Sequence, residues 1–324
     1  MKTVILDGHI INPGDISWAG FEAFGPVQVF DHLTTDNRGE ALEALRDAQA
    51  AFIRQTALNE EILYAAPKLE FVSLTSTGYD QLRPGLLRLA RERGVTVCNI
   101  AEYGAPAVSQ HTFALLLELA GRVGAHDEAV KRGRWGADGE FSFRDYPLME
   151  LAGKTLGIIG FGQIGRAVAR IGAGFGMQVL AYSAHVRPEY QALAEYVPLD
   201  DLLCRSHVVT LHCPLKPETR ELINRESIAK MRDGALLLNT ARGGLLCERD
   251  VAQALNSGKL GGAGLDVVAA EPIQRDNPLL TAKNCLITPH LAWAPLETRQ
   301  RLIDCAVENL RAYLNGSPVH VINP

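Results

Sequence analysis

The stretch that most constrains the fold is GIIGFGQIG, residues 157–165, where an apolar run meets closely spaced glycines. Leu156–Gly160 predicts a strand, and Ile164–Gly172 predicts a helix that follows it directly. The glycines have the spacing G-x-G-x-x-G: Gly160, Gly162 and Gly165. A strand, such a turn and a helix N-terminus together favour binding of a dinucleotide pyrophosphate. Without that context, the same glycines would indicate only a structural turn.

Each glycine has its own expected role in such a turn. Gly160 would make the tight turn, Gly162 would let the backbone approach a phosphate, and Gly165 would let the helix pack on the strand. The first helical residues, Gln163 and Ile164, would bring their backbone amides to the same phosphates.

The end of the second strand bears on which dinucleotide is bound. An acidic residue there usually bonds the ribose hydroxyls of NAD and repels the extra phosphate of NADP. In this chain the strand Gln178–Tyr182 ends at Ser183, and His185 and Arg187 follow it. NAD is the expected coenzyme, while NADP stays possible because Ser183 replaces the usual acid.

The glycine turn begins almost halfway along a chain of 324 residues, which is long enough for two domains. Short strand patterns alternate with helical ones before it, as in parallel βαβ units. These early strands are predicted at Thr3–Leu6, Val27–Phe30, Ala51–Arg54, Glu70–Thr75 and Val95–Asn99. A long helix is predicted over Ala105–Lys131, with Val123 on its apolar face, and an irregular loop that packs over a surface over Arg134–Pro147.

The alternation restarts at the glycine turn and gives six strands, which match a dinucleotide-binding sheet. Besides the two strands already given, they are His207–His212, Ala235–Asn239, Gly262–Val268 and Cys285–Thr288. A last helix, Leu296–Leu314, would cross back to the first domain. The predicted fold is α/β, with two doubly wound parallel-sheet domains: a Rossmann coenzyme domain, residues 101–291, inserted into a flavodoxin-like substrate domain, residues 1–100 and 292–324.

Charge and cysteine usage exclude several classes of partner. The net charge is −5 and the basic residues are scattered, so neither nucleic acid nor an anionic membrane is expected to bind. The six cysteines include no C-x-x-C pair, which favours reduced thiols in a cytoplasmic protein. No apolar run approaches the length of a membrane span, the N-terminus lacks a signal-peptide core, and no metal site is indicated.

Three polar residues follow three strands of the second domain. Arg242 comes after Ala235–Asn239, Glu271 after the strand that carries Asp266, and His290 after Thr288. Singly, each is an ordinary surface or turn residue. Because ligands bind outside the carboxyl ends of strands in open α/β sheets, the three together, beside a nicotinamide coenzyme, indicate a dehydrogenase.

The chemistry of 2-keto acid reduction suits these three side chains. As hydride arrives, negative charge develops on the carbonyl oxygen, and His290 would donate a proton to it. Glu271 would orient the imidazole and stabilise its protonated form. The planar guanidinium of Arg242 would bind the substrate carboxylate and polarise the carbonyl.

Several longer motifs resemble the D-isomer-specific 2-hydroxyacid dehydrogenase family over nearly the whole chain. They are GFGQIG, HCPLKPETRELIN (212–224), LLNTARGGLL (237–246), GLDVVAAEP (264–272) and TPHLAWAP (288–295). FRDYPLMEL (143–151) and Trp293 look most like the bacterial glycerate dehydrogenases, also called hydroxypyruvate reductases. The resemblance implies reduction of hydroxypyruvate or glyoxylate to D-glycerate or glycolate, catalysed by Arg242, Glu271 and His290.

The resemblance also implies the remaining site residues and a homodimer formed through the coenzyme domain. Ser76, Thr77 and Gly78, with Arg242 and Trp293, would bind the substrate, which would lie between the domains. The expected coenzyme contacts besides the glycine turn are Val108, Ser183, Cys213, Pro214, Thr219, Thr240, Ala241, Asp266 and His290. The alternatives are another 2-hydroxyacid, phosphoglycerate, formate or phosphite dehydrogenase, or a corepressor-like protein that senses NAD(H).

Overall fold

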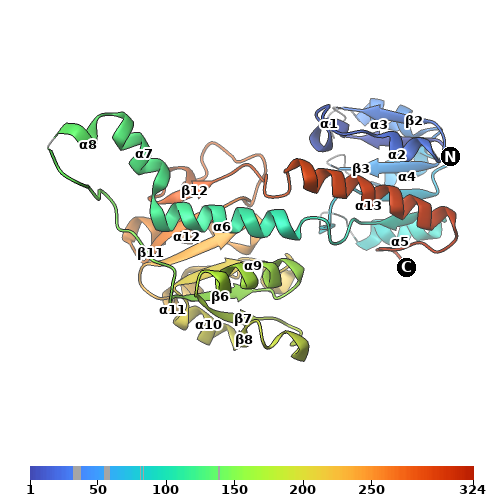
Figure 1. Cartoon of the computed structure of the whole chain (residues 1–324). Helices are drawn as coiled ribbons and strands as arrows, with labels where there is room; N and C mark the ends of the chain where they lie inside the picture. Colours follow the sequence, from blue (N-terminus) through green and yellow to red (C-terminus); the bar gives the residue numbers. More distant parts are fainter. Residues whose placement is uncertain (32–37, 55–58, 81, 83, 138) are drawn as a thin grey trace. The chain divides into compact units, whose positions relative to one another are not determined.

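The computed structural model describes residues 1–31, 38–54, 59–80, 82, 84–137 and 139–324, which form two compact units (Figure 1). Unit 1 is Met1–Gly104 with Trp293–Pro324, and unit 2 is Ala105–Ala292. Unit 1 holds a five-stranded sheet and unit 2 a seven-stranded sheet, with all the strand pairs parallel. The predicted α/β class with two parallel-sheet domains is therefore confirmed.

The sheet of unit 1 has the strand order β2-β1-β3-β4-β5. This order belongs to the flavodoxin-like doubly wound fold. All five strands expected before the glycine turn are present, each within two residues of its predicted ends. They are β1 (Thr3–Leu6), β2 (Val27–Phe30), β3 (Ala50–Ile53), β4 (Phe71–Leu74) and β5 (Thr96–Cys98).

Alternate side chains of the unit 1 strands supply two hydrophobic cores, one on each face of the sheet. Val4 and Leu6 pack in a core with α3 (Arg38–Leu45), α4 (Glu60–Ala65) and α5 (Pro84–Glu92). Ile5 packs in the other core, with α1 (Gly8–Ile11), α2 (Ala19–Glu22) and α13 (Leu296–Leu314). Because both faces are covered, the strands are mostly apolar, and β1, β3 and β4 are buried at every residue.

The sheet of unit 2 has the order β12-β11-β10-β9-β6-β7-β8. The strand order reverses between β6 and β9, which makes that position the topological switch point of a Rossmann sheet. The strands are β6 (Thr155–Ile159), β7 (Gln178–Tyr182), β8 (Glu195–Tyr196), β9 (Val208–Leu211), β10 (Ala235–Asn239), β11 (Leu260–Leu265) and β12 (Cys285–Ile287). The sequence predicted six of these seven, because β8 has only two residues and no readable periodicity.

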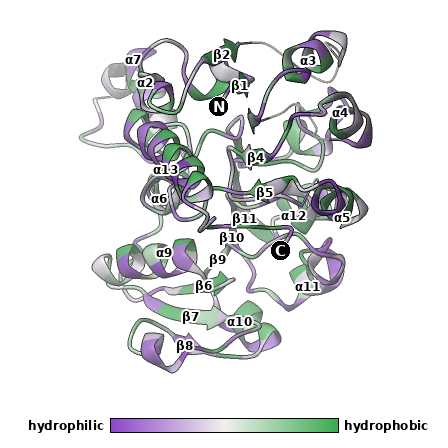
Figure 2. Cartoon of the chain, turned by 90° about the vertical axis from the view of Figure 1, so that its right-hand side faces the viewer, coloured by the Kyte–Doolittle hydropathy of each residue, from purple (hydrophilic) through white to green (hydrophobic). Residues whose placement is uncertain are grey.

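Helices cover both faces of this sheet. α6 (Ala105–Gly121) and α9 (Gln163–Gly174) pack on one face, and α10 (Leu199–Arg205), α11 (Arg225–Lys230) and α12 (Glu248–Ser257) on the other. Figure 2 shows the apolar strands between helices whose outer sides are hydrophilic. Short 3-10 turns complete the unit: η2 (Pro188–Tyr190), η3 (Pro217–Thr219), η4 (Gly243–Leu245) and η5 (Pro278–Thr281).

The single long helix expected over Ala105–Lys131 is wrong. It is broken at Arg122, whose φ of 51° is left-handed, so that α6 ends at Gly121 and α7 (Val123–Lys131) starts in a new direction. Val123, expected on the apolar face, is 67% exposed, and α7 has no buried residue. The apolar face therefore packs on the sheet only as far as Gly121.

The aromatic segment after α7 also differs from its prediction. It contains a short helix, α8 (Arg134–Ala137), and its ring at Phe141 is 94% exposed rather than packed over a surface. Phe143 and Tyr146 contact the ring of His126, with centroids 5.8 and 5.7 Å away. Within unit 2, α7 and α8 project beyond the sheet and its covering helices (Figure 1).

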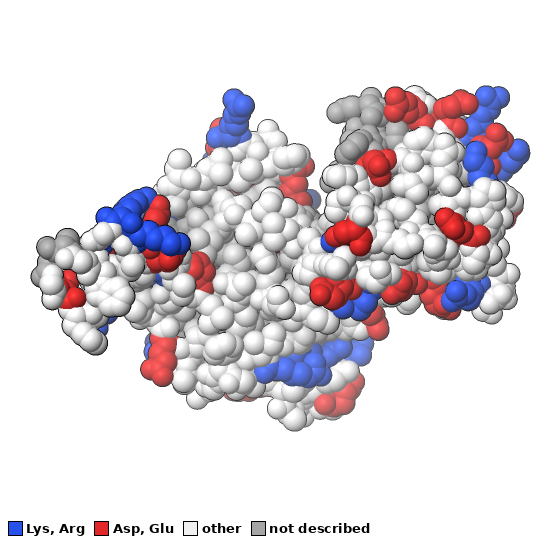
Figure 3. Space-filling view, turned by 45° about the horizontal axis from the view of Figure 1, so that its top comes forward, with Lys and Arg blue, Asp and Glu red and all other residues white. Residues whose placement is uncertain are grey.

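Surface charge and thiols complete the description of the two units. On the face drawn in Figure 3, acidic and basic side chains are interspersed. The six cysteines are free thiols, of which Cys98 is buried and Cys204 exposed. In the residues given above as described, no helix has the length and apolar character needed to cross a membrane.

Candidate active site

The candidate site of unit 2 lies along the carboxyl edge of its sheet. The neighbouring strands β6, β9, β10, β11 and β12 run parallel, so the segments that follow them meet at the same edge. Those segments carry the glycine turn and the three residues expected to be catalytic: Arg242, Glu271 and His290.

Two of the three glycines are required by close backbone contacts. Gly160 has a φ of +96°, and a Cβ there would lie 2.4 Å from the backbone nitrogen of Cys213, which follows β9. A Cβ at Gly165 would lie 2.3 Å from the carbonyl oxygen of Gly160. Gly160 thus allows the turn to touch the next strand, and Gly165 allows α9 to begin against the turn.

Gly162 is different, because a Cβ built on it meets no described atom within 4 Å. It is the N-cap residue of α9, which begins at Gln163 and continues through Ile164. The N-terminus of this twelve-residue helix therefore faces open space at an exposed glycine. Unpaired amides and a positive helix-dipole end are what a dinucleotide pyrophosphate requires, so the residues present fit the coenzyme.

Ser183 directly follows β7, as the sequence indicated. Its hydroxyl accepts a hydrogen bond from the backbone nitrogen of His185 at 3.4 Å. His185 and Arg187 are both exposed, and residues 183–187 contain no carboxylate. The end of this strand is therefore polar or basic where an NAD-selective acid usually stands.

The segment after β9 has an unreactive thiol and a closed turn. Burial raises the pKa of the Cys213 thiol to about 11, so that it is protonated at neutral pH. The hydroxyl of Thr219 donates to the carbonyl oxygen of Pro214 at 2.7 Å and accepts from the backbone nitrogen of Lys216 at 2.8 Å. Thr219 therefore closes this turn with its side chain, and its expected coenzyme contact stays a prediction.

His290 and Glu271 form a close polar pair in the candidate site. Nδ1 of His290 lies 2.7 Å from Oε2 of Glu271, and Oε1 of Glu271 accepts from the backbone nitrogen of Val268 at 3.2 Å. Both side chains are partly exposed, at 40% and 38%. A carboxylate on Nδ1 fixes the ring orientation and directs proton exchange to Nε2.

His290 also has an unusual backbone, with a φ of +53°. A left-handed conformation at a non-glycine residue is costly and persists where the surroundings hold it. The backbone nitrogen of His290 donates to the carbonyl oxygens of Asp266 at 2.8 Å and Thr288 at 3.0 Å. The ends of β11 and β12 thus hold His290 in this conformation.

The Asp266 carboxylate also holds the loop that carries His290. It is 1% exposed and accepts from the Thr288 hydroxyl at 2.7 Å and from the backbone nitrogens of Leu291 and Ala292, each at 2.9 Å. Burial alone would raise the pKa of Asp266, but hydrogen bonds from His111, Thr288, Ala292 and Leu291 outweigh it and lower the pKa. Asp266 therefore stays ionised and anchors residues 288–292.

Sequence reasoning named Val108 of α6 but missed His111 and Thr112 of the same helix. Nε2 of His111 lies 2.9 Å from the Thr288 hydroxyl and 3.4 Å from the Asp266 carboxylate. The Thr112 hydroxyl lies 3.0 Å from that of Thr240, which follows β10, and donates to the carbonyl oxygen of Val108. The available signal was the helical spacing, since His111 and Thr112 follow Val108 by one turn.

Arg242 and Ala241 follow β10 at the neighbouring position on this edge. The Asn239 side chain accepts from the backbone nitrogen of Ala241 at 3.0 Å and donates to the carbonyl oxygen of Arg242 at 2.8 Å. The Arg242 guanidinium donates to the carbonyl oxygen of Ala241 at 2.8 Å. The turn that carries Arg242 is thus held by a buried amide at the end of the strand.

In unit 1, the expected substrate loop Ser76–Gly78 lies after β4. The Ser76 hydroxyl donates to the carbonyl oxygen of Gly78, and the Thr77 hydroxyl to that of Ile100, each at 2.8 Å. The Arg54 guanidinium, which follows β3, stacks 4.0 Å from the centre of the Trp293 ring. Arg54 was missed because a lone arginine after a short strand has no distinguishing pattern.

The described residues contain no group of three or more histidine, cysteine or acidic side chains that could hold a metal ion. The groups that this edge presents are an acid–imidazole pair, a guanidinium and a helix N-terminus. Together with the strand order, these features define a dinucleotide-binding α/β protein.

Comparisons with known proteins identify the family. The family described as "D-isomer specific 2-hydroxyacid dehydrogenase, NAD binding domain" matches residues 113–292. The chain is 47% identical to a hydroxypyruvate reductase of Blautia hydrogenotrophica over 324 residues, which is all of both chains. It is 36% identical to a glycerate dehydrogenase of Methylorubrum extorquens over 299 residues, 92% of each.

A solved structure with a similar fold is an acyclic imino acid reductase in complex with NADPH and D-Arg. Its TM-score is 0.85 and its identity 27%, covering 99% of this chain and all of that one. The chain belongs to the D-isomer-specific 2-hydroxyacid dehydrogenase family, as its motifs predicted.

Proposed function

We propose that this protein uses a nicotinamide coenzyme to reduce a small 2-keto acid, hydroxypyruvate or glyoxylate, to D-glycerate or glycolate. The observation that carries the proposal is the 2.7 Å pair of His290 and Glu271 on the sheet edge that also carries the glycine turn. The similarity to a hydroxypyruvate reductase and a glycerate dehydrogenase supports the choice of substrate.

The coenzyme, when bound, would supply hydride to the carbonyl carbon of the keto acid. The proton for the carbonyl oxygen would come from Nε2 of His290, while Glu271 on Nδ1 stabilises the imidazolium that donates it. Hydride and proton together convert the carbonyl group into a hydroxyl group. Arg242 would bind the carboxylate, because a guanidinium matches two carboxylate oxygens.

The substrate would also be bound by the loop Ser76–Gly78 of unit 1. Because the Ser76 and Thr77 hydroxyls already donate to the carbonyl oxygens of Gly78 and Ile100, the loop would offer the backbone amides of Thr77 and Gly78 to the substrate carboxylate. Trp293, held by the stacked Arg54, would contact the organic part of the substrate. A small 2-hydroxy acid carries the one carboxylate that these groups require.

We infer that the coenzyme site accepts NAD and admits NADP. Asp266 and Thr240 would contact the nicotinamide side, with Val108 at the ring. Cys213 and Pro214 would lie on the adenosine side. The absence of a carboxylate in residues 183–187 supports tolerance of a 2′-phosphate near Ser183.

We infer further that the protein is a cytoplasmic homodimer. The exposed apolar side chains of Val123, Trp135 and Phe141 on the projecting part of unit 2 support an interface there. The free cysteines are compatible with a reducing compartment. Light scattering of the purified protein at twice the mass of one chain would support the dimer, and a monomer at micromolar concentration would contradict it.

The experiment that tests the function is a steady-state matrix of keto acids against both coenzymes. Hydroxypyruvate and glyoxylate are expected to give the highest kcat/KM, with pyruvate and 3-phosphohydroxypyruvate lower. Formate and phosphite oxidation would be assayed in parallel with NAD⁺ and NADP⁺. Coenzyme binding without turnover of any of these compounds would contradict the enzyme and favour a binding protein that senses NAD(H).

A further inference from the structure

A cavity lies at the edge of the unit 2 sheet opposite the candidate active site. Its volume is about 300 Å³, and its lining includes Lys154, His207 and Ala235. These residues stand at the amino ends of β6, β9 and β10, the three strands whose carboxyl ends lead to the glycine turn, Cys213 and Arg242. The length of β6, five residues or roughly 16 Å, separates this cavity from the glycine turn.

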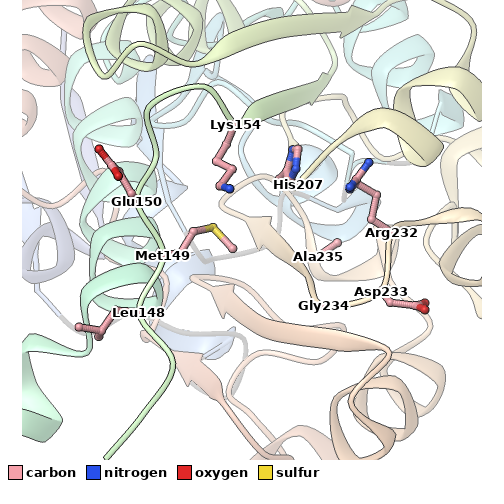
Figure 4. Close-up of a pocket in the computed structure, with 9 residues that line it drawn as sticks. All are labelled: Leu148, Met149, Glu150, Lys154, His207, Arg232, Asp233, Gly234 and Ala235. Atoms are coloured by element: carbon pink, nitrogen blue, oxygen red, sulfur yellow. The ribbon is translucent and has the colours of Figure 1, made fainter. Parts of the chain in front are cut away.

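Three nitrogen-bearing side chains point into the cavity. Figure 4 shows the Lys154 ammonium, the His207 ring and the Arg232 guanidinium directed toward one another, with Met149 and Ala235 beside them. Lys154 and Arg232 come from the segments that precede β6 and β10. Lys154 directly precedes β6, whereas the exposed Arg232 lies in the turn between α11 and β10.

The sheet holds His207 most firmly. Its backbone nitrogen donates to the carbonyl oxygen of Thr155 at 2.9 Å, and its carbonyl oxygen accepts from the backbone nitrogen of Leu236 at 2.9 Å. The backbone nitrogen of Thr155 donates to Nδ1 of the ring at 3.1 Å, which assigns the ring proton of the neutral imidazole to Nε2. His207 thus has a fixed orientation and one defined donor.

The charges around His207 are predominantly basic at close range. Burial, followed by the positive charges of Arg232 and Lys154, lowers the pKa of His207 below its ordinary value. Among the described residues, neither Lys154 nor Arg232 has an acidic side chain within ion-pair distance. A cluster of this kind is electrostatically unfavourable until an anion joins it.

Two acidic residues also line the cavity, but neither neutralises the cluster. Asp233 is 88% exposed and pairs with Lys259 at 2.7 Å, outside the cluster. Glu150 is exposed, and in Figure 4 its carboxylate points away from Lys154. The cavity therefore has a basic end without a bound carboxylate.

We propose that this cavity binds a small phosphate monoester, with its phosphate held by Lys154, Nε2 of His207 and Arg232. Three donors on three separate elements suit the three terminal oxygens of a phosphate dianion better than the two oxygens of a carboxylate. The volume, about ten times the ~30 Å³ share of one water molecule, leaves room for a short organic body over Met149 and Ala235. The proposal concerns binding and does not depend on the proposed reduction.

The test uses sn-glycerol 3-phosphate as the probe, with the purified full chain at constant ionic strength. Calorimetric titration would compare the protein with Lys154→Gln, Arg232→Gln and the control Arg249→Gln, which removes an exposed arginine of α12. Loss of one charge-assisted hydrogen bond is expected to weaken binding at least about tenfold in the two cavity variants and not in the control. Melting temperatures of the variants would verify that each is folded.

A second readout reports on the cavity alone. Nuclear magnetic resonance of the His207 ring, assigned with His207→Gln, would give its titration midpoint with and without the ester. A bound dianion is expected to raise that midpoint, because it stabilises the imidazolium. An unchanged midpoint, or equal affinity in all three arginine and lysine variants, would overturn the site. Equal or tighter binding of glycerate would overturn the choice of phosphate.

Discussion

Nδ1 of His290 lies 2.7 Å from Oε2 of Glu271, although the two residues are nineteen positions apart in the chain. They meet because β11 and β12 are parallel neighbours, so that the segments after them share one edge of the sheet. Glu271 is itself fixed by the backbone nitrogen of Val268. The pair is therefore built by strand pairing and a short turn rather than by a local sequence motif.

Replacing Glu271 by glutamine should separate orientation from charge. Glu271→Gln keeps the size of the side chain but removes the charge that stabilises the imidazolium of His290. We expect kcat for keto acid reduction to fall by about 10²-fold, and steady-state kinetics would measure this fall.

The matched control for that substitution is Glu226→Gln, which changes an exposed carboxylate in the first turn of α11. Coenzyme binding, followed by fluorescence, should be retained in both variants. A kcat of Glu271→Gln equal to that of the unmodified enzyme would show that the carboxylate does not act through His290.

Asp266 should control the order of the loop that carries His290. Asp266→Asn leaves only one acceptor oxygen for the Thr288 hydroxyl and the backbone nitrogens of Leu291 and Ala292. Losing buried hydrogen bonds to a charged group costs about 1.5–3 kcal/mol each. We expect amide exchange at Leu291 and Ala292 to accelerate at least ~10-fold, measured by hydrogen–deuterium exchange.

Thr288→Val, which removes only one of these bonds, provides a graded comparison and should accelerate exchange less. Peptides from unit 1 should exchange at unchanged rates in both variants. Equal protection of residues 288–292 in Asp266→Asn and the unmodified protein would mean that the carboxylate is not their anchor.

Alanine substitutions at the glycines of the turn should affect stability and coenzyme binding differently. Gly165→Ala puts a Cβ 2.3 Å from the carbonyl oxygen of Gly160, so α9 must shift. Overpacking of this kind costs about 1–3 kcal/mol, and we expect a lower melting temperature as well as weaker coenzyme binding. Gly162→Ala meets no described atom within 4 Å and should fold normally while it weakens coenzyme binding by about tenfold or more.

Gly174→Ala, near the end of the same helix, is the control for both. Its Cβ also has open space, so alanine should stabilise α9 by about 0.5–1 kcal/mol and leave coenzyme affinity unchanged. Thermal unfolding and coenzyme titration of the three variants would test whether stability and coenzyme affinity change as expected. If Gly162→Ala lost stability but not affinity, the role of the helix N-terminus would be wrong.

The features that the sequence predicts well are those that produce a local periodicity of apolar residues. The βα alternation gave both sheets, and α13 has the predicted bounds because its apolar residues recur at helical spacing between proline and asparagine. The pairing of Glu271 with His290 followed from one topological rule about the ends of parallel strands. These predictions agree with the structure because each depends on a few adjacent residues and on a general property of the fold.

The features that sequence missed depend on tertiary contacts. Nothing in the sequence around Arg122 requires a left-handed φ, so the break between α6 and α7 can be located only in the structure. The role of His111 is apparent only from its contact with Thr288, which lies 177 residues later in the chain. Arg54 becomes notable only because it stacks on Trp293, which returns from the far end of the chain.

Acid should destabilise unit 2 through His212. Burial lowers the pKa of His212 to about 3, and its Nδ1 has no hydrogen-bond partner among the described residues, while Nε2 lies 2.9 Å from the Thr210 hydroxyl. Because the unfolded state takes up the proton near pH 6.5 and the folded state does not, stability is complete above that pH and falls as the pH drops toward 3. The loss would reach up to about 5 kcal/mol.

Urea unfolding at several pH values between 7 and 4 would measure this slope. His207, whose pKa is also lowered by burial and by Arg232 and Lys154, contributes in the same direction. His212→Gln should lower stability at pH 7 but flatten its dependence on pH. The same slope in the variant and the unmodified protein would show that other groups control the acid response.

The choice between coenzymes should depend on Ser183. This residue ends β7, where a carboxylate would repel the 2′-phosphate of NADP, and the exposed His185 and Arg187 follow it. A new charge a few ångströms from a phosphate near the surface acts with about 1–4 kcal/mol. Ser183→Asp should therefore lower kcat/KM for NADPH by about tenfold or more while that for NADH stays the same or rises. Ser183→Asn introduces a side chain that is nearly equal in size to aspartate but neutral. Comparison of the two variants therefore separates the effect of charge from the effect of shape. If the ratio of the two kcat/KM values moves in neither variant, Ser183 does not face the 2′ position; if it moves equally in both, the shape of the side chain and not its charge determines the preference.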